Sequence, residues 1–323
     1  MLFKGMYYSA QPFYFLPLIL LWLCGVGAFF AMPPHPRVKN PVPGSERTQL
    51  GSGGIRSSFS ASVTHRSLQA VSSRINNILV LRTNFTGSTA EFDTFSLGSA
   101  DNAYSGVASE VERYYRDQSR GKHLVDLTFV PMVSGIAFPN PHTFYGDAST
   151  TQLQIEAGVR SVLAQWDPHI DFADYDSVMI MHAGTGQEVR DGAPTLVNSF
   201  RSSLTDPYQS ADGVSVFSFV MVPEHFFDRI ESIVGVIVHE YGHELGLPDL
   251  YDTSFQSQGI GDWGVMAGGS FGGPGNNGTV PTGFCGWSRV FLGWEEPELV
   301  SSSTHTLLHH ALEIGRASCR ERV

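Results

Sequence analysis

The chain has few cysteines and few positive charges. Only three cysteines occur among its 323 residues, Cys24, Cys285 and Cys319, too few for the disulfide framework of a small secreted scaffold. We expect Cys285 to be a small buried apolar side chain. Lysine and arginine number 20 against 31 aspartate and glutamate residues, which gives a formal net charge of -11. This acidic balance weighs against nucleic acid and anionic lipid as partners.

The amino terminus resembles an export signal. Lys4 precedes an apolar stretch that is densest over residues 16–24 and stops at four small residues, 25–28. The pattern predicts a signal peptide over residues 1–28. An uncleaved membrane anchor over residues 13–32 stays open as the alternative, because about 20 apolar residues can span a bilayer. Residues 29–75 are rich in Pro, Ser, Gly and Arg, which favours a leader or the remnant of a propeptide.

The carboxyl terminus differs from the rest of the chain. Residues 313–323 (EIGRASCRERV) are basic and back-translate without a gap into a common short-read sequencing adapter. We therefore expect this segment to be an artefact and the natural chain to continue past Leu312. The catalytic domain is assigned to residues 76–312 as a truncated unit.

Strand-like and helical patterns alternate along the middle of the chain. Buried-strand patterns cover residues 77–81, 176–182 and 214–222, and residues 124–130 alternate like a strand. Helical spacing covers residues 108–118, 152–166 and 232–246. Such alternation predicts an α/β or α+β domain. We find no internal repeat.

The last of these helices carries a metal-binding pattern. Ser232 is an acceptable N-cap, and Gly246 followed by Pro248 predicts the end of the helix. His239 and His243 lie four residues apart and so project from one face, where both can bind a single zinc ion. Glu240 points off that line and can reach a water on the metal.

The residues after the helix make the pattern more specific. An accidental H-E-x-x-H is expected roughly 0.02 times in this composition. Here Gly246 and Asp249 extend it to H-E-x-x-H-x-x-G-x-x-D, in which the chain turns and brings an oxygen ligand back to the metal. This is the metzincin layout with aspartate as the third ligand, and the Met-containing turn that should follow is present at Met266.

Several segments together resemble a known family. They are AMPPHP (31–36), MHAGTGQE (181–188), VMVPE (220–224), HEYGHELGLPDLYD (239–252) and GDWGVMAGGSFGG (261–273). In this order they are similar to the immune inhibitor A family of secreted metallopeptidases, from about residue 31 to about residue 297.

The resemblance implies residue roles and a maturation step. It implies zinc ligands at His239, His243 and Asp249, a general base at Glu240, the Met-turn at Met266 and a leader that is removed. It also implies structural calcium. However, many members carry alternating Asp and Gly after the segment matching residues 167–174, and this chain does not. A solvated acidic turn of Asp167, Asp171, Asp174 and Asp176 is favoured there over a calcium loop.

Two further residues are candidates near the site. Asp252 follows the third ligand and is expected to brace the loop or the histidines rather than bind zinc. His182, with Gln187 and Glu188, closes a predicted strand. It either borders the substrate cleft or holds a cation, or it belongs to a structural turn.

The sequence therefore predicts a secreted zinc endopeptidase that hydrolyses proteins or peptides with a metal-activated water and a glutamate base. The expected fold is a metzincin-like domain with a twisted, mostly parallel mixed sheet, an active-site helix and an irregular carboxyl-terminal part carrying Met266. One rival is an adhesion protein that retains an inactive protease domain, which would be favoured by loss of Glu240 or of a ligand. The other is a metalloenzyme acting on small molecules.

Overall fold

The computed structural model describes residues 30–31, 75–87, 90–189, 195–254 and 256–296. The predicted signal peptide, most of the predicted leader and the predicted adapter segment lie outside these residues. No helix in the described ranges is long and apolar enough to cross a membrane. The predicted anchor over residues 13–32 falls almost entirely outside them.

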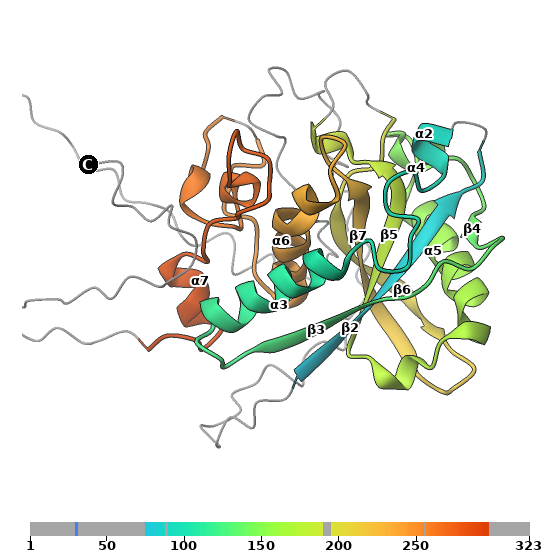
Figure 1. The fold of residues 1–323 in the computed structure, drawn as a ribbon, viewed down its shortest axis with the longest axis horizontal. Coiled ribbons are helices and arrows are strands. Elements are labelled where there is room, and N and C mark those ends of the chain that lie inside the picture. The colour runs from blue at the N-terminus through green and yellow to red at the C-terminus, as the bar shows by residue number, and fades with distance from the viewer. Residues whose placement is uncertain (1–29, 32–74, 88–89, 190–194, 255, 297–323) are drawn as a thin grey trace, which may run out of the picture. The chain divides into compact units, whose positions relative to one another are not determined.

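A seven-stranded mixed sheet organises the described residues (Figure 1). Its strands are β1 (Phe30–Ala31), β2 (Ile75–Phe85), β3 (Leu124–Phe129), β4 (Ala137–Phe138), β5 (Ser177–Thr185), β6 (Phe200–Gln209) and β7 (Ser215–His225). The order is β1-β6-β7-β5-β2-β3, and β4 pairs with the end of β2. The pairs made by β2, and the pair β5 with β7, are parallel, whereas β6 runs antiparallel to both β7 and β1. The predicted mixed, mostly parallel sheet is confirmed.

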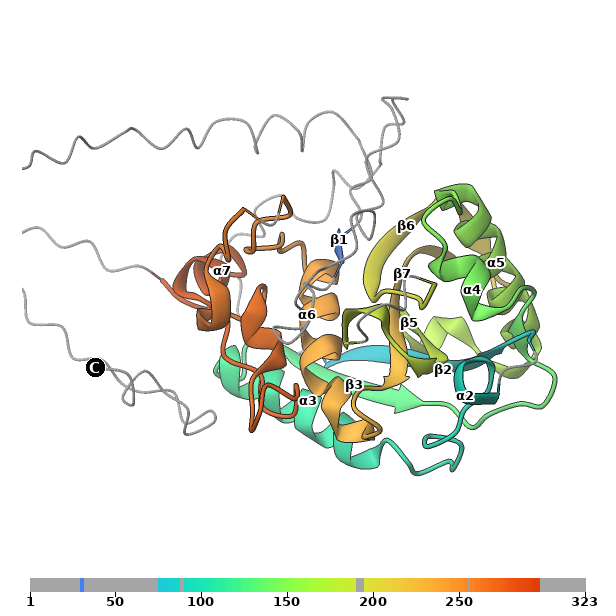
Figure 2. The same cartoon turned by 90° about the horizontal axis from the view of Figure 1, so that it is seen from above.

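Helices cover both faces of this sheet (Figure 2). They are α2 (Ala90–Asp93), α3 (Ser105–Gln118), α4 (His142–Gly146), α5 (Gln152–Trp166), α6 (Val234–Glu244) and α7 (Gly286–Phe291). Val80 and Met181 pack with α3 and α6 in one apolar cluster, while Leu79 and Ile180 pack with α5 in a second. Because the central strands are buried on both faces, they show continuous apolar runs, as parallel strands between helices do.

Helix α6, which carries the two histidines, is buried along nearly its whole length. Residues 234–243 are all buried, since the helix lies between the sheet and the carboxyl-terminal part of the described chain. Its predicted N-cap was wrong: residues Ile230–Ile233 form a short 3-10 turn, and the α-helix begins one residue after it. Its predicted end is confirmed, because Gly246 adopts a φ of 93°, which favours glycine.

The carboxyl-terminal part, residues 247–296, is irregular. It contains two 3-10 turns, Gly261–Trp263 and Gly268–Phe271, and the short helix α7. Cys285 precedes α7 and is partly exposed, with its Sγ 3.4 Å from the Ser288 Oγ. The expectation that Cys285 is buried was wrong, because it lies at the N-cap of α7, a short helix of which only Ser288 is buried.

Glu224 anchors the loop before α3. Its fully buried carboxylate accepts the backbone N–H groups of residues 96–98 at 2.8, 2.5 and 2.8 Å, and that of Gly184 at 2.9 Å. Arg82, also buried, donates to the carbonyls of residues 98, 100 and 130. The loop is thus held from both sides by charge-assisted hydrogen bonds, which are stronger than neutral ones.

Replacing this carboxylate tests its contribution to stability. In Glu224→Gln, an amide NH₂ would face N–H donors, so part of the network loses its acceptor. We expect a loss of about 3 kcal/mol in unfolding free energy and a fall of about 6 to 12 °C in Tm, measured by calorimetry. Glu110→Gln, at a half-exposed ion pair of α3, is the matched control and should change Tm little. Equal Tm values for both variants would contradict this account.

Candidate metal centre

The fold brings together the three side chains that the sequence singles out as ligands. His239 Nε2 lies 3.1 Å from His243 Nε2 and 3.1 Å from Asp249 Oδ1, and His243 Nε2 lies 3.2 Å from the same carboxylate oxygen. Among the described residues, these three form the one group of His, Cys, Asp or Glu that could hold a metal ion. The imidazoles are buried, and the Asp249 side chain is 7% exposed.

Backbone carbonyls orient both imidazoles. His239 Nδ1 donates to the carbonyl of Val265 at 2.7 Å, and His243 Nδ1 donates to the carbonyl of Leu247 at 2.8 Å. With the proton on Nδ1, each Nε2 presents a lone pair to the other and to the carboxylate. Second contacts of this kind fix the orientation of metal-binding histidines in proteins.

The donor set fits a zinc ion. Four ligands at about 2.0 to 2.1 Å in a tetrahedron lie about 3.3 Å from one another, and the three distances here are 3.1, 3.1 and 3.2 Å. Without a cation, two lone pairs and a carboxylate would repel one another in a buried place. The three side chains therefore fit a cation, and three protein ligands are the number that a catalytic zinc site uses.

Burial and charge set the protonation of these groups. Burial lowers the pKa of His243, with the neighbouring Asp249 acting in the opposite direction. Burial alone would raise the pKa of Asp249, but the two histidines, in their protonated form, outweigh it and lower that pKa. Near neutral pH these shifts favour a neutral imidazole and an ionised carboxylate, the forms that bind metal.

Glu240 lies on α6 between the two histidines in sequence and is fully buried. At 100° per residue it is rotated off the line that joins His239 to His243. Its side chain is thus buried within the turn of α6 that carries both histidines.

Met266 packs directly under α6. It is 1% exposed, and a Cβ added at Gly242 would come within 2.6 Å of its Sδ atom. Its carbonyl accepts the N–H of Leu250 at 2.7 Å, next to Asp249. The irregular segment therefore supports both the helix and the loop that returns Asp249.

The other two candidates lie apart from the cluster. Asp252 accepts hydrogen bonds from the backbone N–H groups of residues 254, 256 and 257, so it braces its own loop, one of the two predicted roles. His182 lies inside β5, which continues to Thr185, and its ring is 5.5 Å from that of Phe85.

The side chain of His182 points away from the three potential ligands. Phe85 belongs to the apolar cluster on the α5 face of the sheet, opposite α6. Burial lowers the pKa of His182 to about 4, although its hydrogen bond to the Ala183 carbonyl acts in the opposite direction. Met181 and Ala183, its neighbours in β5, belong to the cluster on the α6 face, so His182 points to the opposite face and does not lie beside α6.

The four aspartates considered for calcium do not meet. Asp167 accepts from Tyr208 and Ala211, Asp171 caps the N–H of Ala173, and Asp176 accepts the N–H of Asn77. These are the capping contacts of acidic turns, and they give calcium no support.

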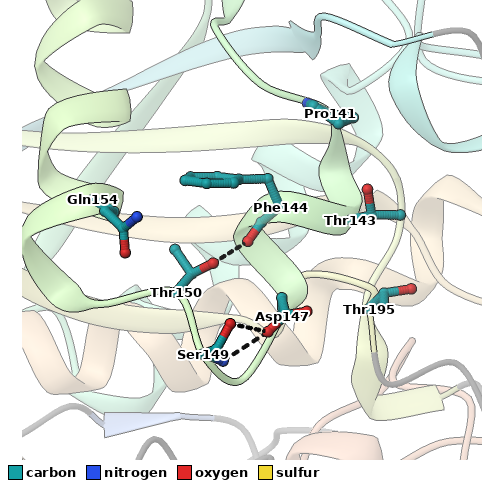
Figure 3. A pocket seen from close by; sticks show the side chains of 8 residues that line it. All are labelled: Pro141, Thr143, Phe144, Asp147, Ser149, Thr150, Gln154 and Thr195. Atoms are coloured by element: carbon teal, nitrogen blue, oxygen red, sulfur yellow. Dashed lines mark hydrogen bonds between the residues drawn. The ribbon is translucent and has the colours of Figure 1, made fainter.

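A surface pocket also lies outside the cluster. It has a volume of about 430 Å³ and is lined by Pro141, Thr143, Phe144, Asp147, Ser149, Thr150, Gln154 and Thr195. Figure 3 shows that its hydrogen bonds are local: Thr150 donates to the Phe144 carbonyl, and Ser149 donates to Asp147. It contains none of the three potential ligands.

The groups that hold the three potential ligands in place were not predicted from the sequence. The two orienting acceptors are backbone carbonyls, which leave no side-chain signal. Strand β6 and the contact between its Arg201 and Glu244, the last residue of α6, were not predicted either. The charged Glu244 directly after His243, at the end of a buried helix, was the signal from which a charged partner could have been predicted.

Comparisons with known proteins cover the part of the chain that contains this site. Residues 176–295 match the model of the immune inhibitor A peptidase M6 catalytic domain. The chain is 29% identical to the pre-pro-metalloprotease PrtV of Vibrio cholerae over 60% of its own length and 25% of that protein. It is 29% identical to immune inhibitor A of Bacillus thuringiensis over 56% of its own length and 31% of that protein.

A solved zinc-dependent peptidase from Methanocorpusculum labreanum is 16% identical, with 67% of this chain and 99% of that chain covered and a TM-score of 0.33. The chain spans about a quarter to a third of the length of the two curated relatives. The matched catalytic domain contains His239, Glu240, His243, Asp249 and Met266. By this match, residues 176–295 are homologous to the catalytic domain of the immune inhibitor A metallopeptidases, family M6, and the chain is homologous to both relatives.

Proposed function

We propose that this chain is a secreted zinc-dependent endopeptidase that hydrolyses peptide bonds in proteins. One observation carries the proposal: two imidazole nitrogens and a carboxylate oxygen converge at 3.1 to 3.2 Å beside a buried glutamate. His239, His243 and Asp249 would hold the zinc ion. Homology to a metallopeptidase family supports the assignment.

The protein's own groups then divide the chemistry. A bound zinc ion would polarise the scissile carbonyl and lower the pKa of a water molecule. Glu240 accepts the proton of the attacking water and returns it to the leaving amine, as a general base and then a general acid. The carbonyls of Val265 and Leu247 keep both imidazoles in one tautomer. Met266 supports the helix from below, in keeping with a metzincin-like arrangement.

The edge strand β6 offers a place for an extended peptide. Phe30 and Ala31 of the leader pair antiparallel with Arg201 and Phe200 of β6, so backbone groups of this edge accept an added strand. Strand addition to a sheet edge is a common way to bind peptides. We propose that substrates bind β6 in the same way.

The same pairing supports a zymogen. If the leader occupies the edge of β6 that substrates need, its removal frees that edge for them. The Vibrio relative is a pre-pro-metalloprotease, which supports a leader that is removed in two steps. Secretion rests on the predicted export signal, and a structural calcium ion stays a prediction.

Metal dependence is the first test. The protein freed of its leader should contain one zinc per chain by mass spectrometry of metals, and phenanthroline should abolish casein hydrolysis until zinc is added back. His239→Ala and His243→Ala should lose zinc and activity, because two ligands do not hold zinc at ordinary free concentrations. Inhibition by a serine-protease reagent, or full metal content in either variant, would contradict the assignment.

The role of Glu240 can be separated from metal binding. Glu240→Gln keeps the shape and the three ligands but removes the basic oxygen, so zinc content and Tm should match the parent. Loss of a general base costs about 10² to 10⁴ in rate, and kcat should fall at least about a hundredfold. Glu231→Gln, at an exposed position before α6, is the control. A Glu240→Gln variant that keeps more than about a tenth of parental kcat would disprove the base assignment.

Removal of the leader should activate the enzyme. A linked strand has an effective concentration in the millimolar range, so cleavage between β1 and β2 should raise kcat/KM on a peptide substrate by about tenfold or more. A synthetic peptide of residues 25–40 should then inhibit competitively. Equal activity before and after cleavage would show that β1 does not block β6.

A further inference from the structure

A charged pair ties the end of α6 to the edge strand. The Nε of Arg201, the second residue of β6, donates to Oε2 of Glu244 at 2.9 Å. Glu244 is the last residue of α6 and directly follows His243. The two side chains are only 13% and 15% exposed, so water screens this pair less than a surface pair.

Two serines complete the contact. Arg201 Nη1 donates to the Ser203 Oγ at 3.0 Å, and the Ser218 Oγ donates to Oε1 of Glu244 at 2.7 Å. Ser203 and Ser218 are directly paired across β6 and β7. Both carboxylate oxygens are thus engaged, and the network joins β6, β7 and α6.

The pair lies where an added strand meets the helix. Arg201 is the residue of β6 that is in register with Phe30 of β1. Its partner is one residue from a potential zinc ligand. A shift of β6 relative to α6 would therefore move a peptide on β6 relative to the three potential zinc ligands.

We propose that Arg201 and Glu244 are positioning residues that fix the distance between the substrate-bearing edge β6 and the metal-binding helix α6. This inference rests on the proposed function. A partly buried ion pair adds little net stability over apolar side chains of similar size, and its attested benefit is a defined geometry. A misplacement of about 1 Å at a reacting centre can cost about 10²-fold in rate.

Two substrates cut at the same bond separate positioning from general damage. A long peptide of eight or more residues pairs with β6, whereas a short blocked dipeptide amide does not. In Glu244→Gln and Arg201→Lys, we expect kcat for the long peptide to fall about tenfold or more. The short substrate should change less than about threefold, with zinc content unchanged. A purely structural role would lower kcat for both substrates equally.

Amide hydrogen exchange gives a readout that does not depend on activity. In Glu244→Gln, residues 200–204 should exchange faster while residues 236–243 of α6 keep their protection. For the long peptide, kcat of the double variant Arg201→Gln/Glu244→Gln should be no more than about threefold below that of either single variant, because the two side chains act as one unit. Glu110→Gln, at the half-exposed pair with Arg113, should leave all of these values unchanged.

The outcomes are distinct. An unchanged ratio of long to short substrate hydrolysis, or unchanged exchange in β6, overturns the positioning pair while the parent remains an active zinc peptidase. A parent without zinc-dependent hydrolysis of either substrate overturns the proposed function itself.

Discussion

The convergence of three acceptors in a buried place is the constraint on which the rest of the structure depends. Two imidazole lone pairs and a carboxylate lie 3.1 to 3.2 Å apart, an arrangement that a cation stabilises and that is costly without one. The helix has to be buried to exclude water, the loop after Gly246 has to return Asp249, and two backbone carbonyls have to hold the rings. Each of these requirements is met by a different segment of the chain.

The sheet supplies the frame for this cluster. Central strands that are apolar on both faces hold α6 on one side and α5 on the other. Met266 fills the space that Gly242 leaves under the helix, and Glu224 fixes the loop that enters α3. The edge strand β6 is joined to the helix by an ion pair between Arg201 and Glu244. Apolar packing thus holds the three potential ligands in place, and a polar contact links their helix to the strand where we propose that peptides bind.

Local patterns made part of this predictable from sequence. Helix α5 was predicted to the residue, since its capping box of Thr151 and Gln154 and its apolar spacing are both local. The three potential ligands follow from one motif with fixed spacing. Strand β6 was missed, because Asp206 and Pro207 interrupt its pattern and its register shifts between Ser203 and Tyr208. For His182 a place at the cleft, a cation site and a structural turn all stayed open, because a sequence does not reveal which face of a strand is turned to the helix.

Anomalous X-ray diffraction at the zinc absorption edge, on crystals of the protein grown without added metal, tests the central claim most directly. The account predicts a single strong peak enclosed by Nε2 of His239, Nε2 of His243 and the carboxylate of Asp249, about 2.0 to 2.2 Å from each. A peak elsewhere in the molecule, or well-ordered density for these three side chains with no zinc between them, would contradict it.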